Sequence, residues 1–490
     1  MAPAEPAPVP ADASGAETER REPHSGRFAI AVITAAFAVS RGVYWLLGYR
    51  FEMNVSFVQY LDPGLLRFNL LQSIYYLHSQ PPLLNLFLGL GLKLFSGSLP
   101  FVFQIIFCAM GLGLALCLYS LMIALGIPAG LSLAAVLSFE LGPATLIYEC
   151  WFYSTYPTAV LLGAAAFWLN RFLTSGKRIY GWAFSIAVAL PVFLNSSFQP
   201  VWFVGVIGLL AWFAYGRLRP VLPLCGGLFA LMLALVLKNG LVLGSFATSS
   251  WYGMNFARIT TFQLPKAERE QLVRGGELSS LALVEPFSPA VRFQAPQKTG
   301  VPALDEEARR DGTTNYNSAA YLDASKIYLR DALWVVRNRP RAYWHGVVQA
   351  IEIYCEPAAT GLDYWIGDLH FVMPLRRGNM GPWIAIYDRS LRPVAIDGLQ
   401  TSVVLLAVVP ALLCFYIVTL FRSRRHLGPE GLTLLFATLA VLYVTATGVL
   451  LDVGENNRMR FVADPLLLVL AADSCARMLR ARKPGGELDG

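Results

Sequence analysis

The sequence predicts an all-α, polytopic membrane protein with about ten transmembrane helices and additional interfacial helices on its external side. Composition is the first reason, because 56% of the side chains are hydrophobic, only 14% are charged and the mean hydropathy is +0.51. A soluble protein of 490 residues is far less apolar. The second reason is a series of apolar runs, each near the roughly 20 residues that a crossing requires. The runs cover residues 28–48, 100–124, 130–148, 157–174, 179–195, 199–215, 220–243, 398–421, 431–451 and 462–478.

Charge and cysteine usage exclude two other classes of protein. The net charge of +7 is of the kind that membrane proteins carry for orientation, so no nucleic-acid partner is expected. The seven cysteines are scattered and show none of the spacings of a metal site. Membrane lipid is therefore the partner that composition predicts.

The stretch "YYLHSQPPLLNLFLGLGLKLF", Tyr75 to Phe95, is an eleventh apolar run, and charge indicates that it does not cross. If it stays on one side, the short connections on the side of the N-terminus hold most cations, and the positive-inside rule makes that side the cytoplasm. These cations are Arg171, Lys177, Arg178, Arg217, Arg219, Arg422, Arg424, Arg425, Arg477, Arg480, Arg482 and Lys483. A crossing would place all of them outside, so the stretch is expected to be an interfacial or re-entrant helix.

This orientation divides the chain into five parts. They are a disordered cytoplasmic tail (1–27), an N-terminal transmembrane module (28–243) with an external loop (49–99), an extracytoplasmic segment (244–397), C-terminal transmembrane helices (398–480) and a cytoplasmic tail (481–490). Within the extracytoplasmic segment, Ser318 to Arg337 predicts an amphipathic helix with Tyr321 and Tyr328 on its apolar face. A second helix is expected after Pro340.

Three stretches carry a resemblance to a known superfamily. A carboxylate follows the first span ("YRFEMN", Glu52), a "HSQPPL" stretch containing His78 follows on a membrane-surface helix, and a second acid stands in the next external loop ("YECWFYSTYP", Glu149). This order is similar to the polyprenyl-phosphate-sugar-dependent membrane glycosyltransferases of the GT-C superfamily. The stretch "GENNRMRFVADPLLLVL" also resembles members of that group. The first loop departs from the usual pattern, because it offers Glu52 and Asp62 rather than a paired Asp-Glu near the span.

The resemblance implies a reaction. A sugar would move from a polyprenyl-phosphate donor to a glycan, lipid or protein acceptor on the extracytoplasmic face, with inversion in a single displacement. The tail composition and the absence of a eukaryotic signature predict a multi-pass protein of the bacterial inner membrane with both termini in the cytoplasm. The sequons at Asn54 and Asn195 leave the endoplasmic reticulum as the alternative. A divalent metal ion could serve as cofactor, although no metal ligands can be named.

Such a transfer needs a carboxylate to take the proton of the incoming hydroxyl. Glu52 is the favoured base. The alternative interpretation is that Glu52 is a solvated carboxylate beside Arg50 without a catalytic role. Glu149 is the second acid, because an aromatic belt explains its neighbouring rings but not an acid among them. Asp62 is the third candidate, and since it precedes Pro63 it is also typical of a helix N-cap.

The departing phosphate needs cations, and the sugar needs polar and aromatic contacts. Arg458 and Arg460 are the first phosphate candidates because they are the only cations on the short external loops, and pairing with Glu455 or Asp452 is their structural alternative. Weaker phosphate candidates are Arg67, Lys93 and Arg258. Candidate contacts to the sugar are His78, Trp151, Tyr153 and Tyr156, where the alternatives are a polar cap for the histidine and an interfacial belt for the rings.

Two ionisable residues fall inside predicted spans, Arg41 in the first and Glu140 in the third. Intramembrane charges pair with one another or serve function. The sequence predicts that these two form an ion pair between the helices, with a structural role favoured over a catalytic one.

Two other classes of function stay open. A lipid or sugar transporter would show repeated halves and helices interrupted at mid-membrane; no repeat is visible in the sequence. A non-catalytic scaffold would keep the fold and bind a partner through the external segment, and the sequence separates this case poorly from an enzyme.

Overall fold

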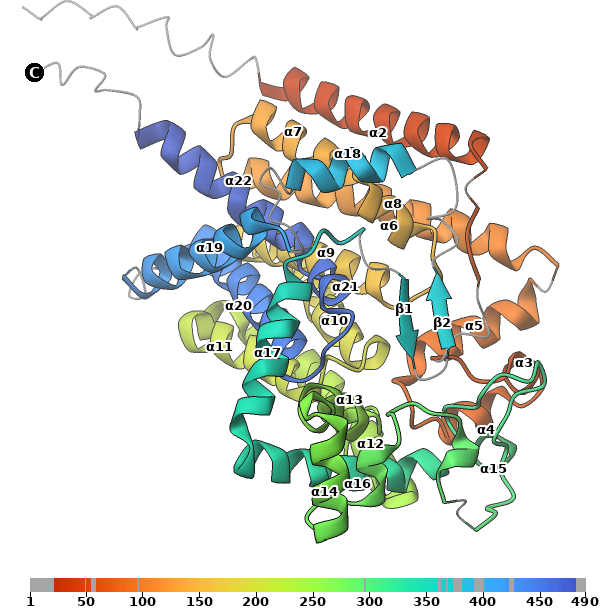
Figure 1. Ribbon diagram of the computed structural model, residues 1–490. Coiled ribbons are helices and arrows are strands. Elements are labelled where there is room, and N and C mark those ends of the chain that lie inside the picture. The colour runs from red at the N-terminus through yellow and green to blue at the C-terminus, as the bar shows by residue number, and fades with distance from the viewer. Residues whose placement is uncertain are drawn as a thin grey trace, which may run out of the picture.

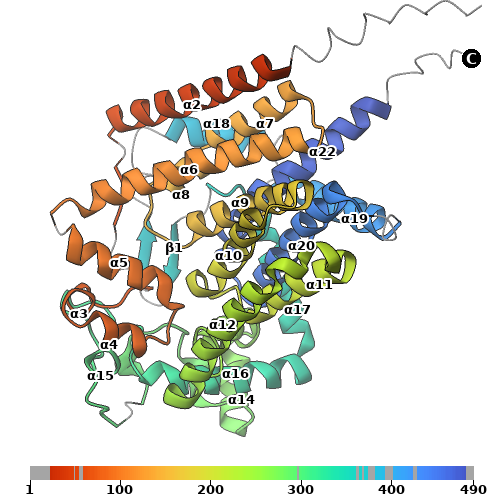
Figure 2. The same cartoon turned by 180° about the vertical axis from the view of Figure 1, so that it is seen from behind.

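The computed structural model describes residues 22–48, 50–53, 59–95, 97–294, 297–359, 363–366, 369–372, 381–391, 401–422 and 427–481. Helices dominate these residues, as the sequence predicts (Figures 1 and 2). The expected tails lie largely outside the described residues. Helix α2 (Glu22–Leu46) nevertheless begins several residues before the expected span, because Glu22 and Pro23 are favourable in a first helical turn.

Five described helical runs are long and apolar enough to cross a bilayer. They are α2, α6 (Leu99–Ala124), the continuous run Pro200–Leu243, α19 (Val403–Arg422) and α20 (Pro429–Leu450). A sixth results if the bent pair α7 (Ala129–Glu140) and α8 (Pro143–Glu149) forms one crossing. The chain is therefore a helical membrane protein.

The run Pro200–Leu243 has 44 residues, about twice the length of one crossing. It consists of α11 (Pro200–Leu218), a 3₁₀ turn (Arg219–Val221) and α12 (Leu222–Leu243). Gln199 at its start donates a hydrogen bond to Thr248 just beyond its end, at 2.8 Å. The run therefore folds back on itself and corresponds to two of the expected crossings.

The remaining expected crossings are α9 (Thr155–Ser175), α10 (Arg178–Leu194) and α22 (Asp464–Ala481). These three helices are not long and apolar enough to be identified as crossings by length and composition alone. Helix α9 packs against α6, α10, α20 and α22 and holds a buried polar contact from Asn170 to Thr433 at 3.3 Å. A helix enclosed by others faces little lipid, so it does not need an apolar surface all round.

The third expected span is broken. Helices α7 and α8 meet at an angle of 55°, because Pro143 has no N–H to donate and its ring excludes a regular turn. The carbonyl oxygen of Phe139 instead accepts hydrogen bonds from the Gly142 N–H at 3.1 Å and the Thr145 hydroxyl at 2.6 Å.

The stretch Tyr75 to Phe95 contains one apolar helix, α5 (Pro82–Leu94). Its 13 residues extend about 20 Å at the helical rise, which is short of the ~30 Å hydrocarbon core. It is therefore too short for a full crossing. Two shorter helices precede it, α3 (Pro63–Phe68) and α4 (Leu70–Tyr75).

The segment that follows α12 is built from short helices and turns. These are α13 (Tyr252–Ile259), α14 (Lys266–Gly275), α15 (Pro302–Asp305), α16 (Ala320–Asn338) and α17 (Pro340–Tyr354), with 3₁₀ turns at Thr261–Gln263, Ser280–Leu283 and Ala290–Arg292. The predicted amphipathic helix is confirmed, because Tyr321 and Tyr328 on α16 are buried while Asp323 and Lys326 are exposed. The helix expected after Pro340 is α17.

One element departs from an all-α protein. Strands β1 (Asp363–Ile366) and β2 (Leu369–Val372) form an antiparallel pair in which Asp363 lies opposite Val372. Their sequences "DYWI" and "LHFV" are rich in aromatic and β-branched residues, which favour strands. Helices α18 (Gly381–Leu391) and α21 (Asn456–Phe461) complete the described elements.

Buried apolar side chains form two large cores. The first lies within the bundle of α6, α9, α10, α11, α20 and α22. The second joins α3, α5, α13 and α16 to residues 144–156 and is rich in aromatic rings. Residues of both cores meet around the α20–α21 connection, where a polar pocket lies between them.

Helices α13 and α16 cross closely at Gly253. A Cβ atom there would lie 1.9 Å from the backbone oxygen of Ser325, so even alanine would force the two helices apart. We expect Gly253→Ala to lower folding stability by roughly 1–3 kcal/mol, measured as the temperature at which purified protein in detergent loses its monodisperse elution peak. Gly113→Ala on α6, where nothing lies within 4 Å, is the control. An unchanged midpoint for Gly253→Ala would contradict this close packing.

Candidate functional site

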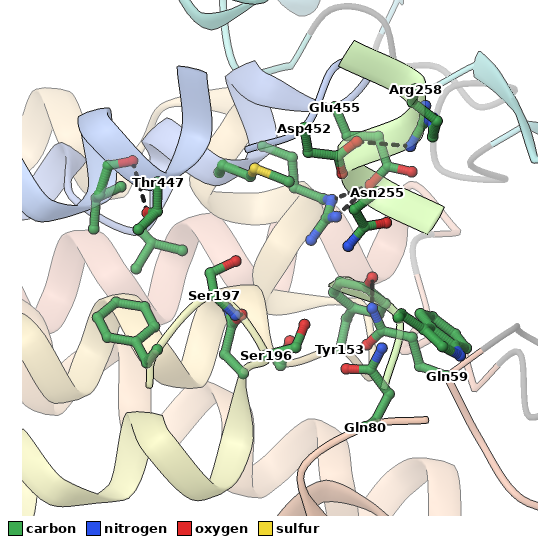
Figure 3. A pocket seen from close by; sticks show the side chains of 18 of the residues that line it. Gln59, Gln80, Tyr153, Ser196, Ser197, Asn255, Arg258, Thr447, Asp452 and Glu455 are labelled. Carbon is green, nitrogen blue, oxygen red and sulfur yellow. Dashed lines mark hydrogen bonds and ion pairs between the residues drawn. The ribbon is translucent and has the colours of Figure 1, made fainter. Parts of the chain in front are cut away.

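A polar pocket lies beside the end of α20 and encloses about 860 Å³ of space that is partly open to solvent. Its lining comes from several separate segments of the chain. These are Gln59, Gln80, the pair Tyr153 and Ser154, the loop Asn195–Phe198, α13 and the α20–α21 connection. In Figure 3, Asn255, Asp452 and Glu455 face Ser196, Tyr153 and Gln80 across the space. Amide, hydroxyl, carboxylate and guanidinium groups thus converge on one cavity.

One wall of the pocket is a pair of stacked rings. Trp151 and Tyr153 lie 4.1 Å apart at an interplanar angle of 8°, and Tyr153 lines the pocket. The guanidinium of Arg458 lies over the Tyr153 ring at 4.7 Å. Gln59 donates a hydrogen bond to the Tyr153 hydroxyl. The ring is therefore held on both sides and at its hydroxyl, which gives the pocket a rigid aromatic surface.

Two ion pairs form the opposite wall. Arg258 Nη1 lies 3.3 Å from Asp452 Oδ1, and Arg458 Nε donates to Glu455 Oε2 at 2.6 Å. Arg458 also donates to the Thr155 hydroxyl at 3.1 Å. Burial raises the pKa of Asp452 to about 6, although Arg258 opposes the shift. The wall thus carries two charges of each sign.

Gly454 shapes this wall. Its φ of +134° lies in the region that favours glycine, and a Cβ atom there would lie 2.1 Å from Arg258 Nη2. A side chain at this position would displace the guanidinium from Asp452. The glycine in "DVGENN" therefore allows the arginine to reach its partner across 194 positions of sequence.

The predicted ion pair between Arg41 and Glu140 is confirmed, at 3.0 Å between Nη2 and Oε2. The same guanidinium also holds Glu149 through two bonds, Nε to Oε1 at 3.0 Å and Nη2 to Oε2 at 2.6 Å. Glu149 further accepts from the Tyr156 hydroxyl at 3.0 Å and from the Cys108 thiol at 3.4 Å. The structure thus places Glu149 and Tyr156 in a buried cluster behind the pocket, and neither lines it.

The two carboxylates of this cluster have unequal environments. Glu149 uses both oxygens and receives four hydrogen bonds from side chains. Among the described residues, Glu140 receives one side-chain bond, at Oε2, and its buried Oε1 has no partner there. Arg41 therefore holds Glu149 by more side-chain contacts than Glu140, and Glu149 is its main buried partner.

Glu52 lies next to the stacked rings without lining the pocket. Its N–H donates to the Cys150 carbonyl at 2.7 Å, and its carbonyl accepts from the Phe152 N–H at 3.0 Å. This bridge pairs it with Trp151, so both side chains point to the same face of the short ladder. Among the described residues its carboxyl group has no hydrogen-bond partner, and burial raises its pKa to about 7.

The other first-loop candidates have structural contacts. Asp62 caps α3 by accepting from the N–H groups of Gly64 at 2.7 Å and Leu65 at 3.1 Å, which confirms the alternative of an N-cap. It also accepts from the Arg310 N–H at 2.9 Å. Arg67 is exposed on α3 with its guanidinium over the Phe68 ring. Neither residue lines the pocket.

His78 is fully buried, and each of its ring nitrogens lies within hydrogen-bond distance of a neighbouring group. Nε2 lies 2.9 Å from the Asn317 carbonyl oxygen, which can only accept, and Nδ1 lies 2.7 Å from the Ser250 hydroxyl. Burial lowers the pKa of His78 to about 3, so the ring is neutral with its proton on Nε2. The histidine positions the "HSQPP" segment, and Gln80, two residues on, lines the pocket.

Arg460, the second phosphate candidate, is buried away from the pocket. It pairs with Asp464 at 3.1 Å and donates to the carbonyl oxygens of Tyr354 and Glu356. Of the two arginines that the sequence singled out in this loop, only Arg458 lines the cavity. Arg460 instead joins α21 to the end of α17.

A metal ion does not fit the side chains that the described residues bring together. Within them, no three side chains of His, Cys, Asp or Glu come together as ligands would. The two pocket carboxylates each face an arginine. The described part of the pocket therefore offers no set of ligands for a metal ion.

Sequence reasoning gave little weight to several pocket residues. Gln59, Gln80 and Asn255 were not singled out, Arg258 was a weaker alternative, and Asp452 was considered only as a structural partner. One signal is available: the run "DVGENNRMR" places six polar or charged residues directly after an apolar span. No comparable feature of the sequence indicates that α13 contributes residues to the pocket.

Comparison of the chain with protein-family models, curated proteins and solved structures found no match. The function is therefore inferred from the arrangement of residues in the pocket.

The unequal contacts of the two buried carboxylates predict unequal losses of folding stability. We expect Glu149→Gln to cost about 3–5 kcal/mol of folding stability, because it leaves Arg41 without its main buried partner. Glu140→Gln should cost less than about 1 kcal/mol, because Glu140 accepts a single side-chain hydrogen bond that the isosteric amide can keep. Midpoints of thermal unfolding in detergent measure both. Equal losses from the two isosteric variants would contradict the unequal roles of the two carboxylates.

Proposed function

We propose that this protein is a membrane glycosyltransferase of the GT-C type that transfers a sugar from a polyprenyl-phosphate donor. The observation that carries the proposal is the pocket in which stacked rings, amides and two arginine–carboxylate pairs converge. Aromatic faces and amide groups suit a sugar, and guanidinium groups suit a phosphate.

The two arginines have separate assignments in this proposal. Arg458 grips the phosphate of the donor, because its guanidinium lies over Tyr153 at the pocket wall and offers a fork of N–H donors. Arg258 adds a second cation when the phosphate replaces Asp452 as its partner. The sugar then lies at the edge of the Tyr153 ring, whose two faces Trp151 and Arg458 cover, and within reach of Gln59, Gln80 and Asn255.

Glu52 is the base in this proposal. The acceptor hydroxyl oxygen attacks the anomeric carbon, the bond from that carbon to the phosphate oxygen breaks, and the hydroxyl proton passes to the carboxylate. A carboxyl group with a pKa of about 7 and no competing partner among the described residues suits that task. Its place on the same face as Trp151 puts it beside the stacked rings. The displacement inverts the anomeric carbon.

The proposal includes ten crossings, a bacterial inner membrane and cytoplasmic termini. The first turn of α2 and the last turn of α22 lie at the same side of the molecule in Figures 1 and 2, which is consistent with termini in one compartment. The pocket lies at the far end of α20 from the cationic segment that precedes it. The acceptor is a glycan, lipid or protein on the extracytoplasmic face.

A transporter is the second candidate, and the broken α7–α8 pair favours it, because interrupted helices with buried charges are found in transporters. The same preparation separates the two. If the purified protein releases or transfers the sugar in detergent, it is an enzyme. If it moves the intact donor across the membrane of vesicles without turnover, it is a transporter.

The first test is turnover of a panel of polyprenyl-phosphate sugars by purified protein. We expect Glu52→Gln to reduce transfer at least about a hundredfold, since general-base catalysis contributes at least that much, while donor binding is retained. Glu352→Gln, an exposed glutamate on α17 outside the pocket, should transfer like the wild type. Full activity of Glu52→Gln would remove this residue from the role of base.

The pocket arginine should affect donor binding. We expect Arg458→Gln to raise the donor KM about tenfold to a hundredfold, because a charged hydrogen bond of about 1.5–3 kcal/mol is lost. Arg67→Gln, on the exposed face of α3, is the matched control. Equal KM values for the two variants would move the phosphate away from Arg458.

The raised pKa of Glu52 sets a pH dependence with a defined sign. The folded-state pKa of about 7 exceeds the ordinary value of 4.5, so the ionised carboxylate destabilises the fold as pH rises through this interval. Transfer should increase over the same range, because the base must be ionised. We therefore expect Glu52→Gln to unfold at a higher temperature than the wild type at pH 8 and at the same temperature at pH 4. A wild type without an activity limb near pH 7 would contradict the assignment.

A further inference from the structure

An apolar groove runs between α11, α19 and α20 and encloses about 880 Å³, open along one side. Trp212 and Phe213 on α11, Phe421 on α19 and Leu439 on α20 are among the side chains that form its walls. The one polar residue in the lining is Thr438, and its hydroxyl donates to the Leu434 carbonyl at 2.8 Å within the same helix. The groove therefore offers a ligand only apolar contact.

This groove is separate from the polar pocket. The pocket uses the residues just before α11 and the end of α20, from Val444 onward. The groove uses the second half of α11, from Leu209, and the first half of α20. The two cavities thus lie toward opposite ends of the same two helices, and a ligand in the groove does not belong to the site already described.

A kink in α11 borders the groove. Ala214 has φ −144° and ψ 38°, which interrupts the helix directly after Trp212 and Phe213. Trp212 is 84% exposed and Phe421 is 63% exposed. Both lie on helices that are long and apolar enough to cross a membrane, so the surrounding medium of this opening is lipid.

Three arginines stand at the same end of these helices. Arg217 lies one turn beyond Phe213, Arg219 follows, and Arg422 comes directly after Phe421. All three are exposed, and none has a hydrogen-bond or ion-pair partner among the described residues. The nearest acid in the sequence of α20 is Glu430, which is exposed in its first turn and forms no ion pair with these arginines among the described residues. The end of the groove therefore carries positive charge that the described residues do not neutralise.

We propose that this groove binds one anionic phospholipid, with an acyl chain between α11, α19 and α20 and its phosphate against Arg217 and Arg422. The apolar walls take the chain because van der Waals contacts with three helices replace looser contacts with bulk lipid tails. The arginines select a headgroup with net negative charge. The site does not depend on the proposed sugar transfer.

Native mass spectrometry of the purified full chain in detergent tests the site, with phosphatidylglycerol and phosphatidylcholine of the same chain length as probes. We expect one phosphatidylglycerol to stay bound under activation that removes phosphatidylcholine. Arg217→Gln and Arg422→Gln should each weaken its retention about fivefold. Arg178→Gln, an exposed cation at the start of α10, is the control and should bind like the wild type.

A second measurement locates the chain independently of charge. Phosphatidylglycerol with brominated acyl chains should quench the fluorescence that Trp212 contributes, obtained as the difference between the wild type and Trp212→Phe. Leu439→Phe, which narrows the groove without adding a tryptophan, should reduce this quenching and the retained lipid together. The proposal would be overturned if the protein retained the two lipids equally, or if Arg178→Gln lost binding to the same degree as Arg217→Gln and Arg422→Gln. Dimers of the protein in place of bound lipid would also overturn it.

Discussion

A single guanidinium group organises the region from which the site is built. Arg41 on α2 binds Glu140 at the end of α7 and Glu149 at the end of α8, and it also donates to the Glu140 carbonyl at 2.9 Å. It therefore fixes both sides of the break at Pro143. Glu149 is two residues before Trp151, so this contact also sets the position of the stacked wall and of Glu52, which is bonded to the same segment.

The pocket exists because two separately packed cores meet without merging. The bundle core supplies Phe198 and Val462, and the aromatic core supplies Tyr153, Trp251 and Phe287. Polar groups line the boundary, since neither core can extend across it without burying the charges of Asp452 and Arg258. The chemistry of the site is thus located at a seam of the fold, where side chains from distant segments point into a common space.

The sequence predicts the helices well and the site only in part. Apolar runs and positive charge located the helices, and the intramembrane arginine identified a partner in Glu140 because unpaired charges are too costly in a membrane. Periodicity cannot show that Arg41 also takes Glu149, since that contact depends on the bend at Pro143. The pairing of Arg258 with Asp452 spans 194 positions and depends on tertiary packing alone. Hydropathy underrates α9 and α22 for a related reason, because enclosure by other helices replaces contact with lipid.

That enclosure has a consequence for how the chain is made. Helix α9 packs against α20 and α22, and its buried Asn170 finds its partner in Thr433, 263 positions later. A moderately polar helix gains little from entering lipid by itself. When α9 leaves the ribosome, α6 is already present and α10 follows at once, but α20 and α22 have not yet been synthesised. We therefore expect the side of α9 that carries Asn170 to stay without its final partners until residues 429–481 arrive.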